Sequence, residues 1–225
     1  MRSQMKLYDY TFSNASVRTR IILYLKGVPF ERIEIDLLTG KRKDGQPFSA
    51  LNPQGMVPTL IDGDLMLNQS IAIAEYLDEL FPTPKLFPSD IKARAFVRCL
   101  AMMIACDGQP LVNLRVRRFL TNTLGLSMDT MIAWMQHWLG DSLRNYETMI
   151  SQHSSFGNFS CGDELTLADI VLVPQILLAK RFGVDVSRYR HLMDIYSRCV
   201  SLEPFQRAIS EYILEDPGYG LTHSK

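Results

Sequence analysis

The sequence predicts a mixed α/β domain followed by an all-helical domain, and three observations predict it. The first third alternates strand-like and helix-like segments, three prolines fall within 81–88, and the pattern beyond them is helical throughout. We therefore expect a first domain over 5–82, a proline-rich linker over 83–88 and a second domain over 89–225.

The first domain is expected to begin with two parallel strands joined by a helix. Residues 5–10 form a short strand candidate, and 16–26 carry apolar residues at helical spacing up to Gly27, which favours a helix stop. Alternating apolar and polar residues over 33–37 predict the second strand. Because a helix joins the two strands, they should run parallel.

A hairpin and a second helix complete this domain. Residues 57–61 and 65–67 flank Asp62-Gly63, which is a hairpin turn signal, and a helix should follow from about Ser70. The order of strand, helix, strand, hairpin and helix is that of a small mixed four-stranded sheet with helices packed on it, as in thioredoxin.

The second domain is expected to be a helical bundle. Helical patterns of apolar residues cover 91–106, 128–152, 166–180 and 190–212. Thr166 and Asp169 have the spacing of a capping box, in which Asp169 accepts from the amide of Thr166. We assign this pair to folding rather than to catalysis.

The composition argues against several classes of function. Lys+Arg and Asp+Glu are both 24, so no global charge indicates nucleic-acid binding. No apolar run reaches the ~18 residues of a membrane span, and the N-terminus lacks a signal-peptide core. We expect a cytoplasmic protein that binds neither nucleic acid nor membrane.

The cysteines indicate neither a metal site nor a redox pair. Cys99, Cys106, Cys161 and Cys199 form no C-x-x-C motif and have no zinc-ligand spacing. We expect buried, reduced thiols and no bound metal.

Three short segments of the first domain could bind a ligand. Pro58 begins a strand, and a cis Val57-Pro58 bond would leave the backbone of Val57 facing outward, where it can pair with a peptide. Gln69-Ser70 precedes a helix whose N-terminus suits a carboxylate; Gln69 could bond the ligand's α-amino acid end while Ser70 caps the helix and donates its hydroxyl.

The third segment is the polar stretch 13–16 at the start of the first helix, whose hydroxyls could stabilise an anion such as a thiolate. A turn proline and plain helix caps are the alternative interpretations of the three segments. In a thioredoxin-like fold the three segments meet on one side of the sheet. Together they fit a small thiol tripeptide such as glutathione.

The chain resembles the glutathione transferases, and within them the zeta class, which includes maleylacetoacetate and maleylpyruvate isomerases. The matching stretches extend over nearly the whole chain: 13–21, 50–60, 68–77, 109–114, 162–169 and 173–175. The more specific of them combine Ser13-x-x-Ser16-x-Arg18-x-Arg20 with Gln109-Pro-Leu-x-Asn-Leu114.

The resemblance implies roles for individual residues. Ser13 would stabilise the glutathione thiolate and is the implied catalytic residue. Glutathione-binding positions would be Ser13, Asn14, Ala15, Val57, Pro58, Gln69, Ser70, Gln109 and Asn113. Substrate-binding positions would be Arg115, Arg181 and Phe12, although either arginine could equally be a structural charge.

The chain departs from the usual zeta motif around Ser13. Asn14 replaces a serine, Ala15 a cysteine, Val17 a tryptophan and Phe12 an arginine. Because no cysteine lies in this loop, we expect glutathione addition chemistry and negligible thiol–disulfide exchange.

The resemblance implies a glutathione-dependent cis–trans isomerase of a maleyl-type dicarboxylate in aromatic catabolism, acting as a homodimer. One alternative is a general transferase that conjugates glutathione to apolar electrophiles; Phe12 favours it, and Tyr10 would then be the activating hydroxyl. Another alternative is a non-catalytic binding protein with the same fold.

Overall fold

The structure is a computed structural model, and it describes residues 4–214. The described chain packs as two units, one of residues 4–86 with 203–214 and the other of residues 87–202. The last described helix therefore packs with the first unit, although it follows the second in the chain. The domain bounds expected from the sequence stay a prediction.

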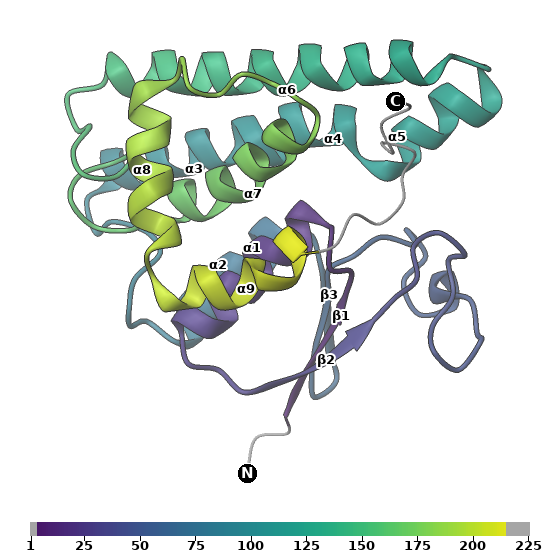
Figure 1. Cartoon of the computed structure of the whole chain (residues 1–225). Helices are drawn as coiled ribbons and strands as arrows, with labels where there is room; N and C mark the ends of the chain where they lie inside the picture. Colours follow the sequence, from purple (N-terminus) through teal and green to yellow (C-terminus); the bar gives the residue numbers. More distant parts are fainter. Residues whose placement is uncertain (1–3, 215–225) are drawn as a thin grey trace. The chain divides into compact units, whose positions relative to one another are not determined.

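The first unit contains a mixed four-stranded sheet with the order β2-β1-β3-β4 (Figure 1). Its strands are β1 (Met5–Asp9), β2 (Phe30–Glu34), β3 (Thr59–Asp62) and β4 (Leu65–Asn68). β1 pairs parallel with β2 and antiparallel with β3, and β3 and β4 form the hairpin. The predicted topology is confirmed.

The position of β2 was predicted a few residues too late, at 33–37. The parallel ladder runs from Met5 opposite Phe30 to Asp9 opposite Glu34, so the end of β1 also ends β2. Ile35 is fully buried beyond the ladder, where it contributes to a small cluster with Phe48 and Val57. Its N–H still donates to the carbonyl of Asp9 at 2.7 Å, so the alternating pattern continues one buried residue past the end of β2.

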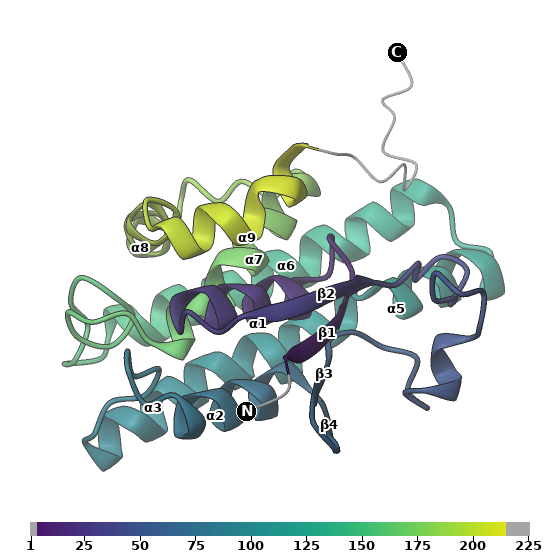
Figure 2. The same cartoon turned by 90° about the horizontal axis from the view of Figure 1, so that it is seen from below.

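Three helices belong to the first unit: α1 (Asn14–Leu25), α2 (Ser70–Leu80) and α9 (Glu203–Leu214). α1 is followed by Gly27 at a φ of 63°, a left-handed conformation that glycine adopts without steric cost. α9 lies along α1 (Figure 2). Leu7, Ile21 and Ile73 are fully buried, and burial of each such side chain contributes ~1.5–3 kcal/mol.

The second unit is helical. Its helices are α3 (Ile91–Met102), α4 (Gln109–Val112), α5 (Leu114–Arg118), α6 (Met128–Ser151), α7 (Leu167–Arg181) and α8 (Arg190–Val200). π-helical turns occupy Met103–Gly108 and Phe119–Thr123. Within the described part of this unit there is no strand, only an isolated bridge between Phe159 and Gly162.

The single helix predicted over 190–212 is wrong, because the structure has two helices there. α8 ends at Val200 and α9 begins at Glu203. Pro204 explains the break: it has no N–H to donate to a preceding turn, and it disfavours helical backbone at the residue before it. Apolar spacing alone could not separate the two helices.

The predicted capping box is confirmed at the start of α7. Asp169 is fully buried and accepts from the N–H of Thr166 and the N–H of Ser160, both at 2.8 Å. Burial raises the pKa of Asp169, and the hydrogen bonds from Ser160 and Thr166 oppose that shift. α7 is buried over most of its length, so this cap fixes the central helix of the unit.

Two expectations about the second unit need correction. Cys161 and Cys199 are buried as expected, but Cys99 and Cys106 are exposed; all four thiols are free. The helical segment Ile91–Thr123 is also long and apolar enough to cross a membrane by length and composition. It packs against α6 and α7, and 33% of its most apolar stretch is buried; the absence of membrane binding stays a prediction.

Candidate functional site

Ser13 caps the first helix of the sheet domain. Its backbone is extended, with φ −85° and ψ 117°, and its Oγ accepts from the N–H of Ser16 at 3.3 Å. A serine hydroxyl has one proton and two lone pairs, so the cap uses a lone pair and leaves the proton for another acceptor. Capping and anion stabilisation, which the sequence left as alternatives, are therefore compatible at Ser13.

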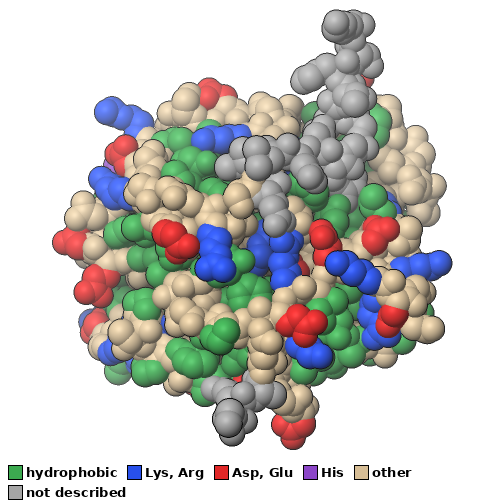
Figure 3. Space-filling view, turned by 60° about the horizontal axis from the view of Figure 1, so that its bottom comes forward, with side chains coloured by type: hydrophobic (Ala, Val, Ile, Leu, Met, Phe, Trp, Pro, Cys, Tyr) green, Lys and Arg blue, Asp and Glu red, His purple; other side chains and the backbone are tan. Residues whose placement is uncertain are grey.

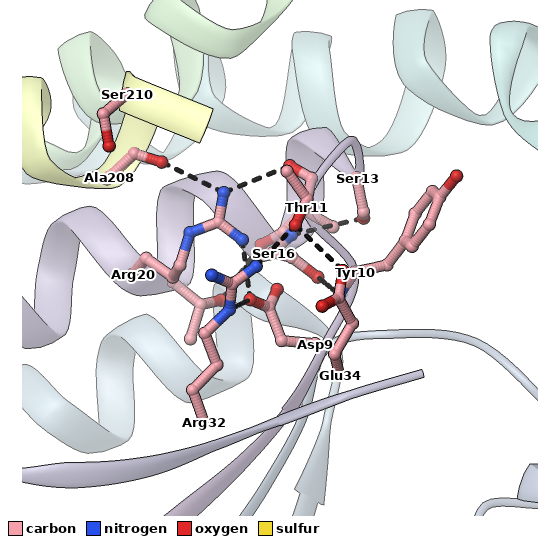
Figure 4. A network of polar contacts seen from close by, with 12 residues as sticks. Asp9, Tyr10, Thr11, Ser13, Ser16, Arg20, Arg32, Glu34, Ala208 and Ser210 are labelled. Carbon is pink, nitrogen blue, oxygen red and sulfur yellow. Dashed lines mark hydrogen bonds and ion pairs between the residues drawn. The ribbon is translucent and has the colours of Figure 1, made fainter. Parts of the chain in front are cut away.

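A buried ionic network lies beside the connection from β1 to α1 (Figure 4). Asp9 is fully buried and accepts from Arg20 Nη1 at 2.6 Å and from Arg32. Arg20 Nη2 also donates to the carbonyl of Thr11 at 3.1 Å and to that of Ala208 in α9 at 3.0 Å. The buried Asp9 carboxylate thus has two cationic partners, which offset the cost of burying its charge in a low-dielectric interior.

The same network holds Thr11 from both sides. Arg32 Nη2 donates to the Thr11 hydroxyl at 2.6 Å, and that hydroxyl donates to Glu34 at 3.0 Å. Thr11 stands two residues before Ser13, whose N–H closes a turn by donating to the carbonyl of Tyr10 at 3.0 Å. The arginines therefore fix the segment that presents Ser13.

Val57 lies in a second ordered loop. The Val57-Pro58 bond is cis, as predicted, and the side chain of Val57 packs with Ile35 and Phe48. The ladder between β1 and β3 ends at Thr59, and no turn or loop hydrogen bond of the described chain involves the Val57 backbone. That backbone is therefore available for pairing with an extended ligand.

Asn52 organises this loop and was missed by the sequence analysis. Its fully buried side chain donates to the carbonyl of Met56 at 2.7 Å and to Thr59 Oγ1 at 3.2 Å. Its Oδ1 accepts from Asn68 Nδ2 at 3.3 Å, and Thr59 also donates to Asn68 at 2.8 Å. One asparagine thus ties the loop before Val57 to the residue that precedes Gln69.

Gln69 has a strained backbone. Its φ of 70° is the one positive value found at a non-glycine residue in the described chain. A conformation of this kind costs ~1–3 kcal/mol and persists where surrounding contacts impose it, often at a binding site. The side chain is exposed, and its Nε2 donates to Gln54 Oε1 at 3.2 Å.

Ser70 does not cap the second helix, in contrast to the prediction. Gln69 occupies the N-cap position without a side-chain cap bond, and Ser70 is the first helical residue. The Ser70 Oγ instead accepts from Arg18 Nε of α1 at 2.6 Å. The capping assignment failed because it depended on the backbone turn at Gln69, which no local pattern reveals.

The remaining predicted positions of the first unit lie near Ser13 in the chain. Asn14 is buried and Ala15 is half-buried at the start of α1. Phe12 is half-buried and packs against Tyr10 and Tyr212, with ring centroids 5.7 and 5.9 Å apart. Where the zeta motif has a cation, this chain therefore has a small aromatic cluster.

Four predicted positions belong to the second unit. Gln109 begins α4, and its Oε1 is buried without a hydrogen-bond partner among the described residues. Asn113 caps α5 by accepting from the N–H of Val116 at 3.1 Å. Arg115 is exposed on α5, and Arg181 ends α7. Their roles in the site stay predictions.

Charges of both signs are mixed on the surface. On the face drawn in Figure 3, basic and acidic side chains lie interspersed between apolar and neutral ones. Within the described residues no group of three or more histidine, cysteine or acidic side chains could hold a metal ion. The candidate site is therefore described from the polar groups named above.

Comparison with known proteins identifies the family. Residues 3–79 match the glutathione S-transferase N-terminal domain, and residues 144–203 match its C-terminal domain. Maleylpyruvate isomerase of Ralstonia sp is 41% identical over 91% of this chain and 96% of its own length. A probable maleylacetoacetate isomerase of Vibrio cholerae is 39% identical over 91% of this chain and 95% of its own.

Solved structures agree with these sequences. A zeta-class maleylpyruvate isomerase in its holo form has a TM-score of 0.85 and 40% identity, over 90% of this chain and 95% of that one. A maleylacetoacetate isomerase from Anaeromyxobacter dehalogenans with bound glutathione has a TM-score of 0.81 and 35% identity, over 92% of this chain and 96% of that one. The chain therefore belongs to the glutathione S-transferase family, in its zeta class.

Proposed function

We propose that the protein is a glutathione-dependent cis–trans isomerase of a maleyl-type dicarboxylate in aromatic catabolism. One observation carries the proposal from the structure: two hydrogen bonds connect the segments that hold the predicted glutathione contacts. Arg18 connects α1, which Ser13 caps, to Ser70 of α2, and Gln54 connects the loop before Val57 to Gln69. The relatives named maleylpyruvate and maleylacetoacetate isomerase support the reaction.

The residues of the first unit fit glutathione. The start of α2 has no side-chain cap, so its first N–H groups and the Ser70 hydroxyl can bind the γ-glutamyl carboxylate, with Gln69 beside them. The Val57 backbone can pair with the cysteinyl residue. The Ser13 hydroxyl can then donate to the sulfur.

Bound glutathione would supply a thiolate that adds to the substrate's double bond and leaves after rotation, which turns the cis isomer into the trans isomer. Ser13 and the N-terminus of α1 stabilise negative charge on the sulfur and so lower the pKa of the thiol. Arg115 and Arg181 would hold the two carboxylates of the substrate. Binding in one site contributes proximity, on the order of 7–11 kcal/mol of the barrier at best.

A side-by-side assay tests the proposal. Purified protein is given maleylpyruvate, maleylacetoacetate or a chloro-nitrobenzene, each with and without glutathione. Isomerisation that requires glutathione and leaves its concentration unchanged supports the proposal. Consumption of glutathione with the chloro-nitrobenzene alone refutes it.

A second candidate is a general glutathione transferase for apolar electrophiles. The cluster of Phe12, Tyr10 and Tyr212 favours it, because an aromatic surface replaces a cation that would bind a carboxylate. In that case Phe12→Arg would reduce conjugation of apolar electrophiles, and the enzyme would form conjugates faster than it isomerises.

We also propose that the protein is a cytoplasmic homodimer. Leu65 and Met66 on the edge strand β4 are 38% and 39% exposed, and Ile91 and Met102 on α3 are 74% and 43% exposed. Apolar side chains at an open sheet edge and along a helix favour contact with a second copy. Sedimentation velocity measures the mass, and fractionation of cells tests the location.

A further inference from the structure

Arg18 is a buried arginine that donates a hydrogen bond to a predicted ligand contact. It lies in the second turn of α1, is 4% exposed, and donates through Nε to Ser70 Oγ at 2.6 Å. Ser70 is itself 5% exposed and is separated from Arg18 by 52 residues of chain. This hydrogen bond connects the helix that Ser13 caps to the start of α2.

We infer that Arg18 is a positioning residue for glutathione, which orients the Ser70 hydroxyl toward the γ-glutamyl carboxylate. The inference rests on the proposed function. An arginine only donates hydrogen bonds, so the contact occupies a lone pair of Ser70 Oγ. The hydroxyl proton must then point away from Arg18 and can be donated to an anion.

The charge of Arg18 also strengthens that donor. A cationic donor gives a shorter and stronger hydrogen bond than a neutral one, and it polarises the hydroxyl that accepts it. The 2.6 Å separation is short for an N–H donor. A polarised serine hydroxyl with a fixed proton binds a carboxylate better than one that rotates freely.

The start of α2 is arranged so that Ser70 needs this support. Gln69 is the N-cap but makes no side-chain cap bond, and its positive φ sets the direction in which α2 begins. The Gln69 side chain therefore does not fix the Ser70 hydroxyl. Arg18 does so from the adjacent helix.

Lys26 provides a matched control for a purely structural tie. It lies after the other end of α1 and joins the same two helices, because its Nζ donates to Asp78 of α2 and to the carbonyl of Phe81, both at 2.6 Å. Its side chain is fully buried. If Arg18 only held α1 to α2, then loss of Lys26 would have the same consequences.

The test compares Arg18→Met, Arg18→Lys, Ser70→Ala and Lys26→Met in the full-length protein. Calorimetry gives the Kd of glutathione and of an analogue in which hydrogen replaces the γ-glutamyl α-carboxylate. We expect Arg18→Met to weaken glutathione binding about tenfold, and to raise its KM with kcat at saturation unchanged. Binding of the analogue should not change, and Arg18→Lys should restore part of the affinity.

The double variant Arg18→Met/Ser70→Ala should bind glutathione no worse than Ser70→Ala, because both changes remove one interaction. Additive losses, an equal loss with the analogue, or an equal effect of Lys26→Met would overturn the inference. If Arg18→Met does not fold, the glutathione and analogue affinities of Arg18→Lys and Ser70→Ala are compared in the same way. A wild-type protein that does not bind glutathione overturns the proposed function as well.

Discussion

The strained backbone at Gln69 gives a prediction in which stability and binding change in opposite directions. Gln69→Gly removes the Cβ that makes a φ of 70° unfavourable, and relief of this strain should raise the free energy of unfolding by ~1–3 kcal/mol. Glycine also gains entropy in the unfolded chain, which should lower the free energy of unfolding by ~0.4–1 kcal/mol. The net expectation is a protein about 0.5–2 kcal/mol more stable, with a Tm higher by roughly 2–6 °C.

The same variant should bind glutathione more weakly by about 1–3 kcal/mol, because the side-chain contact to the γ-glutamyl group is lost. Gln69→Ala is the matched control: it loses the same contact but keeps the Cβ, so its stability should remain within about 0.5 kcal/mol of wild type. Urea unfolding gives stability and calorimetry gives affinity.

Two results would refute this reasoning. If Gln69→Gly is no more stable than Gln69→Ala, the positive φ stores no strain. If both variants bind glutathione as tightly as wild type, Gln69 does not contact the ligand.

Three further predictions concern the turn before α1 and the cap of α7. Ser13→Ala should raise the pKa of the bound glutathione thiol, which is measured by thiolate absorbance, and should lower kcat roughly 10²-fold. If Ser13→Ala keeps full activity and Tyr10→Phe loses it, then Tyr10 is the activating hydroxyl. Phe12→Arg should lower the KM for a maleyl-type substrate, since it adds a cation for a carboxylate; an unchanged KM in steady-state kinetics contradicts this. Asp169→Ala should destabilise the fold by about 2–4 kcal/mol in urea unfolding, because two buried N–H groups lose their acceptor, and stability close to wild type would contradict that role.

Local sequence patterns were enough to predict most of the fold. The hairpin at Asp62-Gly63 and the helix stop at Gly27 depend on the conformation of single residues, and both are present in the structure. One error arose where a distant partner decides the outcome, because β2 ends where β1 ends. The other was local: Pro204 separates two helices that share one apolar pattern, and apolar spacing alone does not register the proline.

The candidate site divides in the same way. Ser13, Val57 and Gln69 stand in short motifs next to an element boundary, so their positions could be predicted. Arg18 and Asn52 act on partners brought near by folding: Arg18 reaches Ser70 across 52 residues, and Asn52 reaches Asn68 across 16. A polar residue inside a helix or loop gives no sign in the sequence of the partner it will have.

The return of α9 to the first unit has a consequence for synthesis on the ribosome. α1 emerges well before α9, whose Phe205 and Ala208 are 0% and 2% exposed. Until they arrive, Arg20 lacks the carbonyl of Ala208 and one side of α1 is uncovered. The nascent chain therefore cannot complete its glutathione-binding unit until α9 has been synthesised. A chain that stops before Glu203 lacks α9, so its first unit stays incomplete even if the second unit folds.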